Sequence, residues 1–252
     1  MTAGTLALAV LAAFVAHLVK GITGFGSSLV LVPALTFLWG PREAIFTSAC
    51  LDLVAGLAHG WKVRRLVRPS LVGAVFLPLV AGQWLGTALL VDLSEKPLER
   101  AVGTVIALFA LEILLRPVRP GRGELHDMAP GDRPLLARAA VAGALGGVLG
   151  GLTGAAGPPI ILYMRRWFRE TFFRAQLIAI FLLGAVSMIT MLWVRGVGEP
   201  ALVGRAVLLL PALVAGAVLG TALSTHLDRV AFSRVVGAVV LLSGLGLALG
   251  AR

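Results

Sequence analysis

The sequence predicts an all-α polytopic integral membrane protein with two inverted repeats, each made of a broken membrane hairpin and three transmembrane helices. Of its 252 residues, 58% are apolar and 13% are charged, against about 25% charged in an average soluble domain. Mean hydropathy is +0.96, and many uncharged runs approach the length of about 20 residues that a helix needs to cross a bilayer. Similar segments also recur in the same order in both halves.

Composition and charge exclude several classes of function. A soluble enzyme is excluded because too little polar surface is available to cover a water-soluble globule. The net charge of +10 does not predict a nucleic-acid partner, because the basic residues lie in short loops, as the positive-inside rule requires. The single Cys50 leaves no internal disulfide, and the sequence contains no P-loop, HExxH or Cys/His metal motif. We therefore expect no catalytic residue, metal site or cofactor.

The uncharged runs define the expected elements in order. They cover residues 3–19, 27–40, 44–61, 71–91, 101–115, 139–164, 175–194, 206–224 and 235–251. The only extended polar stretch, rich in Arg, Pro and Gly, separates the fifth run from the sixth. We therefore expect a first repeat over 1–115, a cytoplasmic linker over 116–138 and a second repeat over 139–252.

Three pairs of matching segments indicate an internal duplication. LVAGQWLGTAL at 79–89 matches LVAGAVLGTAL at 213–223, and GITGFG at 21–26 matches the start of GLTGAAG at 151–157. The dipeptide Arg-Glu at 42–43 matches Arg-Glu at 169–170. Because the matches keep the same order, duplication explains them better than chance similarity between glycine-rich runs.

The distribution of basic residues predicts that the two repeats have opposite orientations. Loop 62–70 contains four basic residues and no acid, and the segment 165–174 contains four arginines. Placing both on the cytoplasmic side, together with the linker, requires an inverted arrangement, which is common in transporters. Residues 3–40 and 139–164 are each too short for two comfortable spans. We expect them to form two hairpins that enter from opposite faces, with apices near the midplane, besides six full spans.

The two glycine motifs are the leading site candidates, because irregular backbone inside a membrane is tolerated only beside protein or a watery cavity. Each precedes an expected helix start, where unpaired N–H groups and the positive end of the helix dipole attract anions. We therefore predict an anion site without a salt bridge, with hydroxyl donors from the Thr and Ser side chains. The alternative is that the glycines only permit close helix packing. The candidate residues are Gly21, Thr23, Gly24, Phe25, Gly26, Ser27 and Ser28 in the first half, and Gly151, Thr153, Gly154, Gly157 and Pro158 in the second.

Two charged residues of the first half are further candidates. Asp52 lies near the middle of run 44–61, with Ser48 one turn before it and His59 two turns after it. A carboxyl group in the membrane often marks an ion path, so we assign Asp52 to proton coupling. The alternatives are a structural pair with Lys20 or a hydrogen bond to Ser48. Lys20 precedes the first glycine motif and is a candidate substrate contact, unless its side chain extends to the interface instead.

Other polar residues are weaker candidates. Arg42 and Arg169 begin equivalent helices on opposite faces, where they could draw anions into two vestibules or act as topology anchors. Gln176 is favoured over Gln83 as a cavity-lining residue, although amides in membrane helices also hold helices together. His17 is interpreted mainly as a packing residue.

The sequence resembles the sulfite exporter TauE/SafE family over essentially its whole length. The motifs that carry the resemblance are 21–26 with Pro33, 151–154 with the prolines at 158–159, and the paired GxxLGT segments at 82–87 and 216–221. The resemblance implies an inner-membrane transporter of sulfite, organosulfonates or related small oxyanions. Alanines at 155–156 stand where the first motif has Phe and Gly, so the two halves are not expected to contact the ligand equally.

The resulting hypothesis is a secondary transporter of the bacterial inner membrane that exports sulfite or sulfoacetate-like anions by alternating access and is a candidate for proton coupling. The inside-negative potential favours anion export by about 2.3 kcal/mol per charge per 100 mV. The alternatives are a non-transporting membrane scaffold or assembly factor, and a transporter of a different small ion. The expected partners are the anion and the lipid bilayer, and a homodimer is left open.

Overall fold

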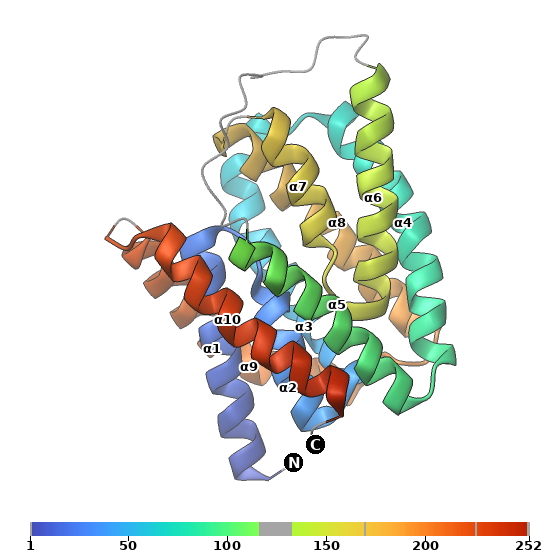
Figure 1. Ribbon diagram of the computed structural model, residues 1–252, viewed down its shortest axis with the longest axis vertical. Coiled ribbons are helices and arrows are strands. Elements are labelled where there is room, and N and C mark those ends of the chain that lie inside the picture. Colours follow the sequence, from blue (N-terminus) through green and yellow to red (C-terminus); the bar gives the residue numbers. More distant parts are fainter. Residues whose placement is uncertain (1, 116–132, 169, 225, 251–252) are drawn as a thin grey trace.

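The computed structural model describes residues 2–115, 133–168, 170–224 and 226–250. Within these ranges every regular element is helical (Figure 1). The elements are α1 (Ala3–Thr23), α2 (Ser27–Trp39), α3 (Pro41–Val63), the short 3-10 helix η1 (Arg64–Leu66), α4 (Pro69–Asp92), α5 (Glu95–Leu115), α6 (Arg133–Thr153), α7 (Gly157–Trp167), α8 (Glu170–Val194), α9 (Pro200–Leu223) and α10 (Arg229–Leu249).

Seven of the described helices are long and apolar enough to cross a membrane, namely α1, α3, α4, α6, α8, α9 and α10. The chain is therefore a multi-pass membrane protein, as the composition predicts. Five of the six expected full spans are among the seven. The sixth, α5, is 21 residues long but includes Glu95, Lys96, Glu99, Arg100 and Glu112, so that every stretch of 18 residues within it carries more than two charged side chains.

Each expected hairpin consists of one long arm and one short arm. The long arms α1 and α6 have 21 residues each, and the short arms α2 and α7 have 13 and 11. A helix of 21 residues is about 31 Å long, so the first arm of each hairpin is longer than the sequence suggested. The reason is that Gly21 and Gly151 remain helical, and α6 already begins within the segment expected as linker. We call residues 24–26 the first break and residues 154–156 the second break.

The most extensive helix packing joins helices of the first half to helices of the second half. Helix α4 of the first half packs on α6 of the second, and α9 of the second half packs on α1 of the first, while α3 packs on α8 and α5 on α10. Figure 1 shows α1 beginning at the lower end of the molecule and α6 beginning at the upper end. The two hairpins therefore begin at opposite ends of the molecule.

Glycine seams hold two of these helix pairs close together. A Cβ atom at Gly82 or Gly86 of α4 would collide with backbone atoms of α6, and one at Gly216 or Gly220 of α9 would collide with backbone atoms of α1. Glycine at such positions lets two helix backbones approach closely in a membrane. The duplicated GxxLGT segments are therefore explained by helix packing.

The outer surface carries large apolar side chains on the membrane-crossing helices. Leu77 and Trp84 of α4, Val218 of α9 and Leu242 of α10 are each more than half exposed. In a soluble protein such a surface would be a liability, but lipid covers it in a bilayer.

Candidate functional site

Both breaks are short turns that require glycine. Gly24 and Gly26 have φ values of +87° and +88°, and Gly154 has a φ of +72°. These are left-handed conformations, which residues with a Cβ atom rarely adopt. The first break joins α1 to α2 and the second joins α6 to α7, each over three residues. The sequence motifs therefore predicted the location of both breaks.

The duplicated threonines close these turns. The Thr23 hydroxyl lies 2.8 Å from the carbonyl oxygen of Val19 and 2.7 Å from that of Phe25, and the Thr153 hydroxyl donates to the carbonyl of Leu149 over 2.7 Å. Each hydroxyl oxygen also accepts the N–H two residues further on, over 3.3 Å. Both hydroxyls thus form hydrogen bonds within their own turns. This role explains why threonine occurs in both glycine motifs, and it needs no ligand.

The two breaks line one cavity of about 100 Å³, measured as the space open to the centre of a water-sized sphere. One ordered water needs about 10–15 Å³ on this measure, so the cavity has room for a small ion with several atoms. Phe25 and Gly26 of the first break line it together with all three residues of the second break. The first turns of α2 and α7 also reach it. The expectation that both glycine motifs meet at one place agrees with this geometry.

Among the residues that the structure describes, the polar side chains of the cavity wall all come from the first half. They are Lys20, Ser27, Ser28, Asp52 and Gln83. The lining residues of the second half carry no polar side chain; they are Gly150, Gly154, Ala155, Ala156, Gly157, Pro158, Ile161, Phe181, Gly184, Ala185 and Met188. A bound ion would therefore meet a polar wall on one side and an apolar wall with backbone groups on the other.

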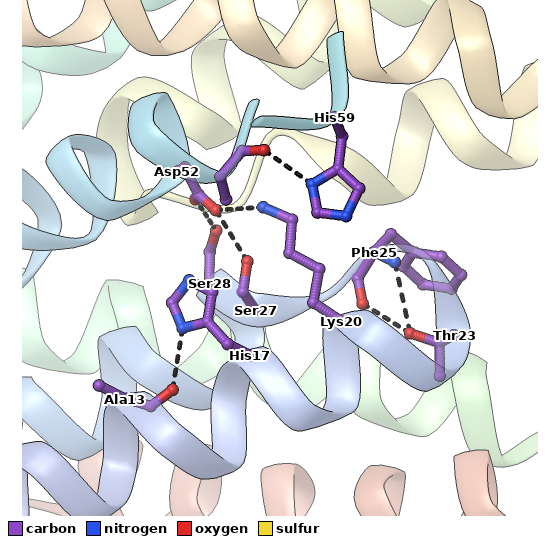
Figure 2. Close-up of polar contacts among 10 residues, drawn as sticks. Ala13, His17, Lys20, Thr23, Phe25, Ser27, Ser28, Asp52 and His59 are labelled. Atoms are coloured by element: carbon purple, nitrogen blue, oxygen red, sulfur yellow. Dashed lines mark hydrogen bonds and ion pairs between the residues drawn. The ribbon is translucent and has the colours of Figure 1, made fainter. Parts of the chain in front are cut away.

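Asp52 lies at the centre of the polar wall. The Lys20 ammonium group donates to Oδ1 of Asp52 over 2.6 Å, the Ser27 hydroxyl donates to the same oxygen over 2.8 Å, and the Ser28 hydroxyl donates to Oδ2 over 2.8 Å. Figure 2 shows these three side chains converging on the carboxylate. The Lys20 and Asp52 side chains are 25% and 20% exposed. The carboxylate faces the start of α2, where the helix dipole favours negative charge.

The ion pair corrects the prediction of an anion site without a salt bridge. The positive end of α2 is already neutralised by the carboxylate of Asp52, which the sequence could not place there. The start of α7 is also a weaker anion site than expected, because two prolines in its first turn remove two N–H donors. The pair with Lys20, considered as an alternative, is present. Ser48 makes no hydrogen bond to Asp52, and its buried hydroxyl has no partner among the described residues.

Six residues predicted to bind substrate do not line the cavity, namely Gly21, Thr23, Gly24, Gly151, Thr153 and Gln176. Thr23, Gly24 and Thr153 form the turns described above, and the other three are packing residues. A Cβ atom at Gly21 would meet backbone atoms of α9, and one at Gly151 would meet backbone atoms of α4, so both belong to the helix seams. Gln176 is fully buried, where its amide donates to the carbonyl of Leu66 over 2.7 Å and accepts the N–H of Arg68 over 2.8 Å. For these positions the packing alternatives describe what the structure shows.

Of the two arginines assigned to vestibules, Arg42 is held by the backbone of a neighbouring helix. Arg42 donates three hydrogen bonds of 2.7–3.2 Å to the carbonyls of Leu90, Val91 and Leu93 at the end of α4. It therefore neutralises the negative end of that helix. Its repeat counterpart Arg169 lies outside the described residues.

Sequence reasoning ranked Gln83 below Gln176 as a cavity-lining residue and missed the contact of Arg174 with the first break. Gln83 donates to the carbonyl of Gly184 over 3.1 Å and accepts the hydroxyl of Ser187, and it reaches the cavity. The sequence did carry a signal for Gln83, because this residue stands where the matching repeat segment has Ala217. The guanidinium of Arg174 lies 3.2 Å from where a Cβ atom at Gly24 would be, and contacts the Thr23 carbonyl over 3.5 Å. Arg174 thus packs against the first break.

Two histidines lie near this region. The Nδ1 atom of His59 lies 2.9 Å from the Ala55 carbonyl and that of His17 lies 2.8 Å from the Ala13 carbonyl, so both Nδ1 atoms carry a proton (Figure 2). His59 is exposed, whereas His17 is fully buried and its Nε2 has no partner among the described residues. Within the described ranges, no group of three or more His, Cys, Asp or Glu side chains could hold a metal ion.

The comparison with protein families agrees with the motifs and the fold. The model of the family described as sulfite exporter TauE/SafE matches residues 9–247. The chain belongs to the sulfite exporter TauE/SafE family. This membership makes it a membrane transporter, and the match includes both breaks and the whole cavity wall. No match was found among curated proteins or among solved structures.

Proposed function

We propose that this TauE/SafE protein is a secondary transporter that exports a small oxyanion, such as sulfite or a sulfoacetate-like organosulfonate, across the bacterial inner membrane. The observation that carries the proposal is the single cavity between the two breaks. It brings an ammonium group, two hydroxyls and an amide together with the first turns of two helices. These groups suit the oxygens of a small anion, and the cavity volume suits its size.

The membrane potential supplies a driving force for the export of an anion that crosses without a proton. An inside-negative potential favours the outward movement of an anion by about 2.3 kcal/mol per charge per 100 mV. Export of sulfite therefore needs no nucleotide site. Asp52 is the candidate group for coupling to protons, because it is the carboxylate that lines the cavity.

We further propose that residues 1–115 and 139–252 are inverted repeats joined by a cytoplasmic linker over 116–138, and that they give alternating access to the cavity. The packing between the halves supports this proposal. Helix α4 packs on α6, the corresponding helix α9 packs on α1, and the two hairpins begin at opposite ends of the molecule. In transporters built this way, one part of the bundle moves around a fixed site. The glycine seams would keep the long arms together during that movement.

Anion flux from liposomes tests the proposal. Purified protein is reconstituted into vesicles loaded with sulfite or sulfoacetate, and efflux is followed under an inside-negative potassium diffusion potential. Wild type should release the anion faster than empty vesicles. Lys20→Gln should lower the rate at least tenfold, because it removes the cation from the cavity wall. Lys96→Gln, on the exposed side of α5, is the matched control and should transport normally.

Two results would refute the proposal. One is the absence of flux for every oxyanion tested, although the protein is folded and inserted. The other is equal flux in Lys20→Gln and Lys96→Gln, because the cavity cation would then play no part in transport. A scaffold or assembly factor would give the first of these results.

A further inference from the structure

The carboxylate of Asp52 is bound in the way that a substrate anion would be. One oxygen accepts from the ammonium group of Lys20 and the hydroxyl of Ser27, and the other accepts from the hydroxyl of Ser28. All four side chains line the cavity. The donors come from the end of α1 and the start of α2, while the carboxylate comes from α3. The protein's own anion thus occupies the donors on both sides of the first break.

An incoming anion would need these same donors. Lys20 is the single cation among the described residues that line the cavity, and Ser27 and Ser28 are its only hydroxyls. The remaining polar side chain, Gln83, already donates to Gly184 and accepts from Ser187. The described part of the second half adds no polar side chain to the wall. The ammonium group has three N–H groups to donate, but its charge is balanced by Asp52, and each hydroxyl has only one proton to donate. An anion therefore cannot be coordinated well while Asp52 keeps the ion pair and both hydroxyls.

We infer that a small anion and a proton bind to this site together, because the Asp52 carboxylate and the substrate anion compete for Lys20, Ser27 and Ser28. The proton comes from a solvent acid and bonds to a carboxylate oxygen of Asp52, which weakens the three hydrogen bonds and leaves the donors to the anion. No other covalent bond changes. This inference rests on the proposed function and specifies its coupling.

Charge balance supports the same conclusion. Lys20 and Asp52 together carry no net charge, so a singly charged anion would leave the partly buried site with one uncompensated negative charge. Such a charge is costly away from bulk water. One proton on Asp52 restores neutrality, with Lys20 and the anion as the new pair. The expected ratio is therefore one proton for each singly charged anion. Carried together, the two would move no net charge, so the concentration gradient of the anion, and not the membrane potential, would drive its export.

The charged and titratable groups that face Asp52 are Lys20 and His17, both on α1. Helix α2 presents only hydroxyls to it. On α8, the guanidinium of Arg174 lies on the Thr23 carbonyl at the first break.

Other charges packed against α3 lie at its two ends. Arg205 of α9 pairs with Glu43 at the beginning of the helix, and Arg64 of η1 donates to the Trp61 carbonyl at its other end. Glu95 of α5 lies near Gly40, just before α3 begins.

His17 is the rival proton carrier. Its Nε2 is buried and has no partner among the described residues, so it could accept a proton. A proton on His17 would neutralise an added anion as well as one on Asp52 would. It would leave the carboxylate on its three donors, however, and so would not make them available. The geometry therefore assigns the proton to Asp52.

Calorimetry of sulfonate binding tests the inference. Methanesulfonate is titrated into purified protein between pH 5.5 and 8.5, in pairs of buffers that differ in ionisation enthalpy, so that the heats report proton uptake. Methanesulfonate keeps a single negative charge over this range, so any proton taken up binds to the protein. Wild type should take up one proton per anion at the upper end of the range, where Kd should rise about tenfold per pH unit.

Two variants locate the proton. Asp52→Asn resembles the protonated carboxyl in shape and should bind methanesulfonate without proton uptake, with a Kd that no longer varies with pH. His17→Asn is the matched control and should keep the proton uptake of wild type. Loss of the proton in His17→Asn with its retention in Asp52→Asn would overturn the assignment.

The wild-type measurement decides the coupling even if a variant fails to fold. Binding of methanesulfonate with no proton uptake at any pH would overturn the inference and leave the proposed function standing. If wild type binds neither methanesulfonate nor sulfite at any pH, and vesicles show no flux, then the proposed function itself is wrong.

Discussion

Replacing Gly21 by alanine separates the two interpretations of the glycine motifs. The motif predicts that Gly21 contacts the substrate, but the structure places it on the seam between α1 and α9. A Cβ atom there would lie 2.8 Å from the carbonyl oxygen of Ala217 and 2.8 Å from the backbone nitrogen of Thr221. Favourable contacts between heavy atoms begin at about 3.5 Å. The methyl group would therefore be about 0.7 Å too close to two backbone atoms.

Backbone atoms cannot rotate away as side chains can, so α1 and α9 would have to separate. Overpacking a close interface costs typically about 1–3 kcal/mol, and we expect about 2–3 kcal/mol here because every near neighbour is backbone. For a chain of this size, that loss lowers Tm by about 4–12 °C. The cavity wall should keep its composition, so the affinity for methanesulfonate should change less than threefold, about 0.6 kcal/mol.

Gly4→Ala is the matched control on the same helix, because a Cβ atom at Gly4 meets nothing within 4 Å. Tm is measured by size-exclusion chromatography of heated samples in detergent, and affinity by calorimetry. Gly4→Ala should match wild type in both. The reasoning about the seam is refuted if Gly21→Ala is as stable as Gly4→Ala, or if it keeps its stability and loses anion binding.

Two further matched pairs test the cavity itself. Gly26 and Gly250 both have positive φ and open space around the missing Cβ, so alanine at either should lower the free energy of unfolding by a similar amount, about 1–2 kcal/mol. Only Gly26→Ala, at the start of α2, should weaken methanesulfonate binding. Equal affinities of the two variants in calorimetry would count against the site. Gln83→Leu should lower the affinity about tenfold, or 1.4 kcal/mol. Gln176→Leu should bind methanesulfonate normally but unfold at a lower Tm, because two buried hydrogen bonds are lost at about 1 kcal/mol each. Weaker binding in Gln176→Leu with normal binding in Gln83→Leu would instead support the site predicted from the sequence.

Much of the fold could be predicted from the sequence because membrane burial imposes strong constraints. Long uncharged runs predict helices, and duplicated motifs predict two equivalent hairpins. The exact role of each glycine was harder to predict. Gly21 lies on a helix seam and Gly24 takes a left-handed conformation, although only two residues separate them. A seam and a turn both require the absence of Cβ, so the residue type alone does not distinguish them.

The composition of the cavity wall depends on contacts between distant helices. Lys20 and Asp52 are 32 positions apart, and helical periodicity within one segment says nothing about how α1 approaches α3. The sequence could offer their pairing only as an alternative. Gln83 was predictable in principle, because it replaces the alanine at 217 in the matching repeat segment. Polar residues that break a repeat's symmetry therefore indicate the site better than the duplicated motifs do.

A structure determined with a heavy-atom substrate analogue tests the central claim most directly. The protein is crystallised with bromoethanesulfonate at a pH where binding is measured in solution, and the bromine is located by anomalous scattering. We predict one anomalous peak in the cavity between the two breaks, with the sulfonate near Lys20 and Ser28 and with Asp52 released from at least one donor. A peak at another place, in a protein shown to transport the analogue, would contradict the claim that the anion is held between the breaks.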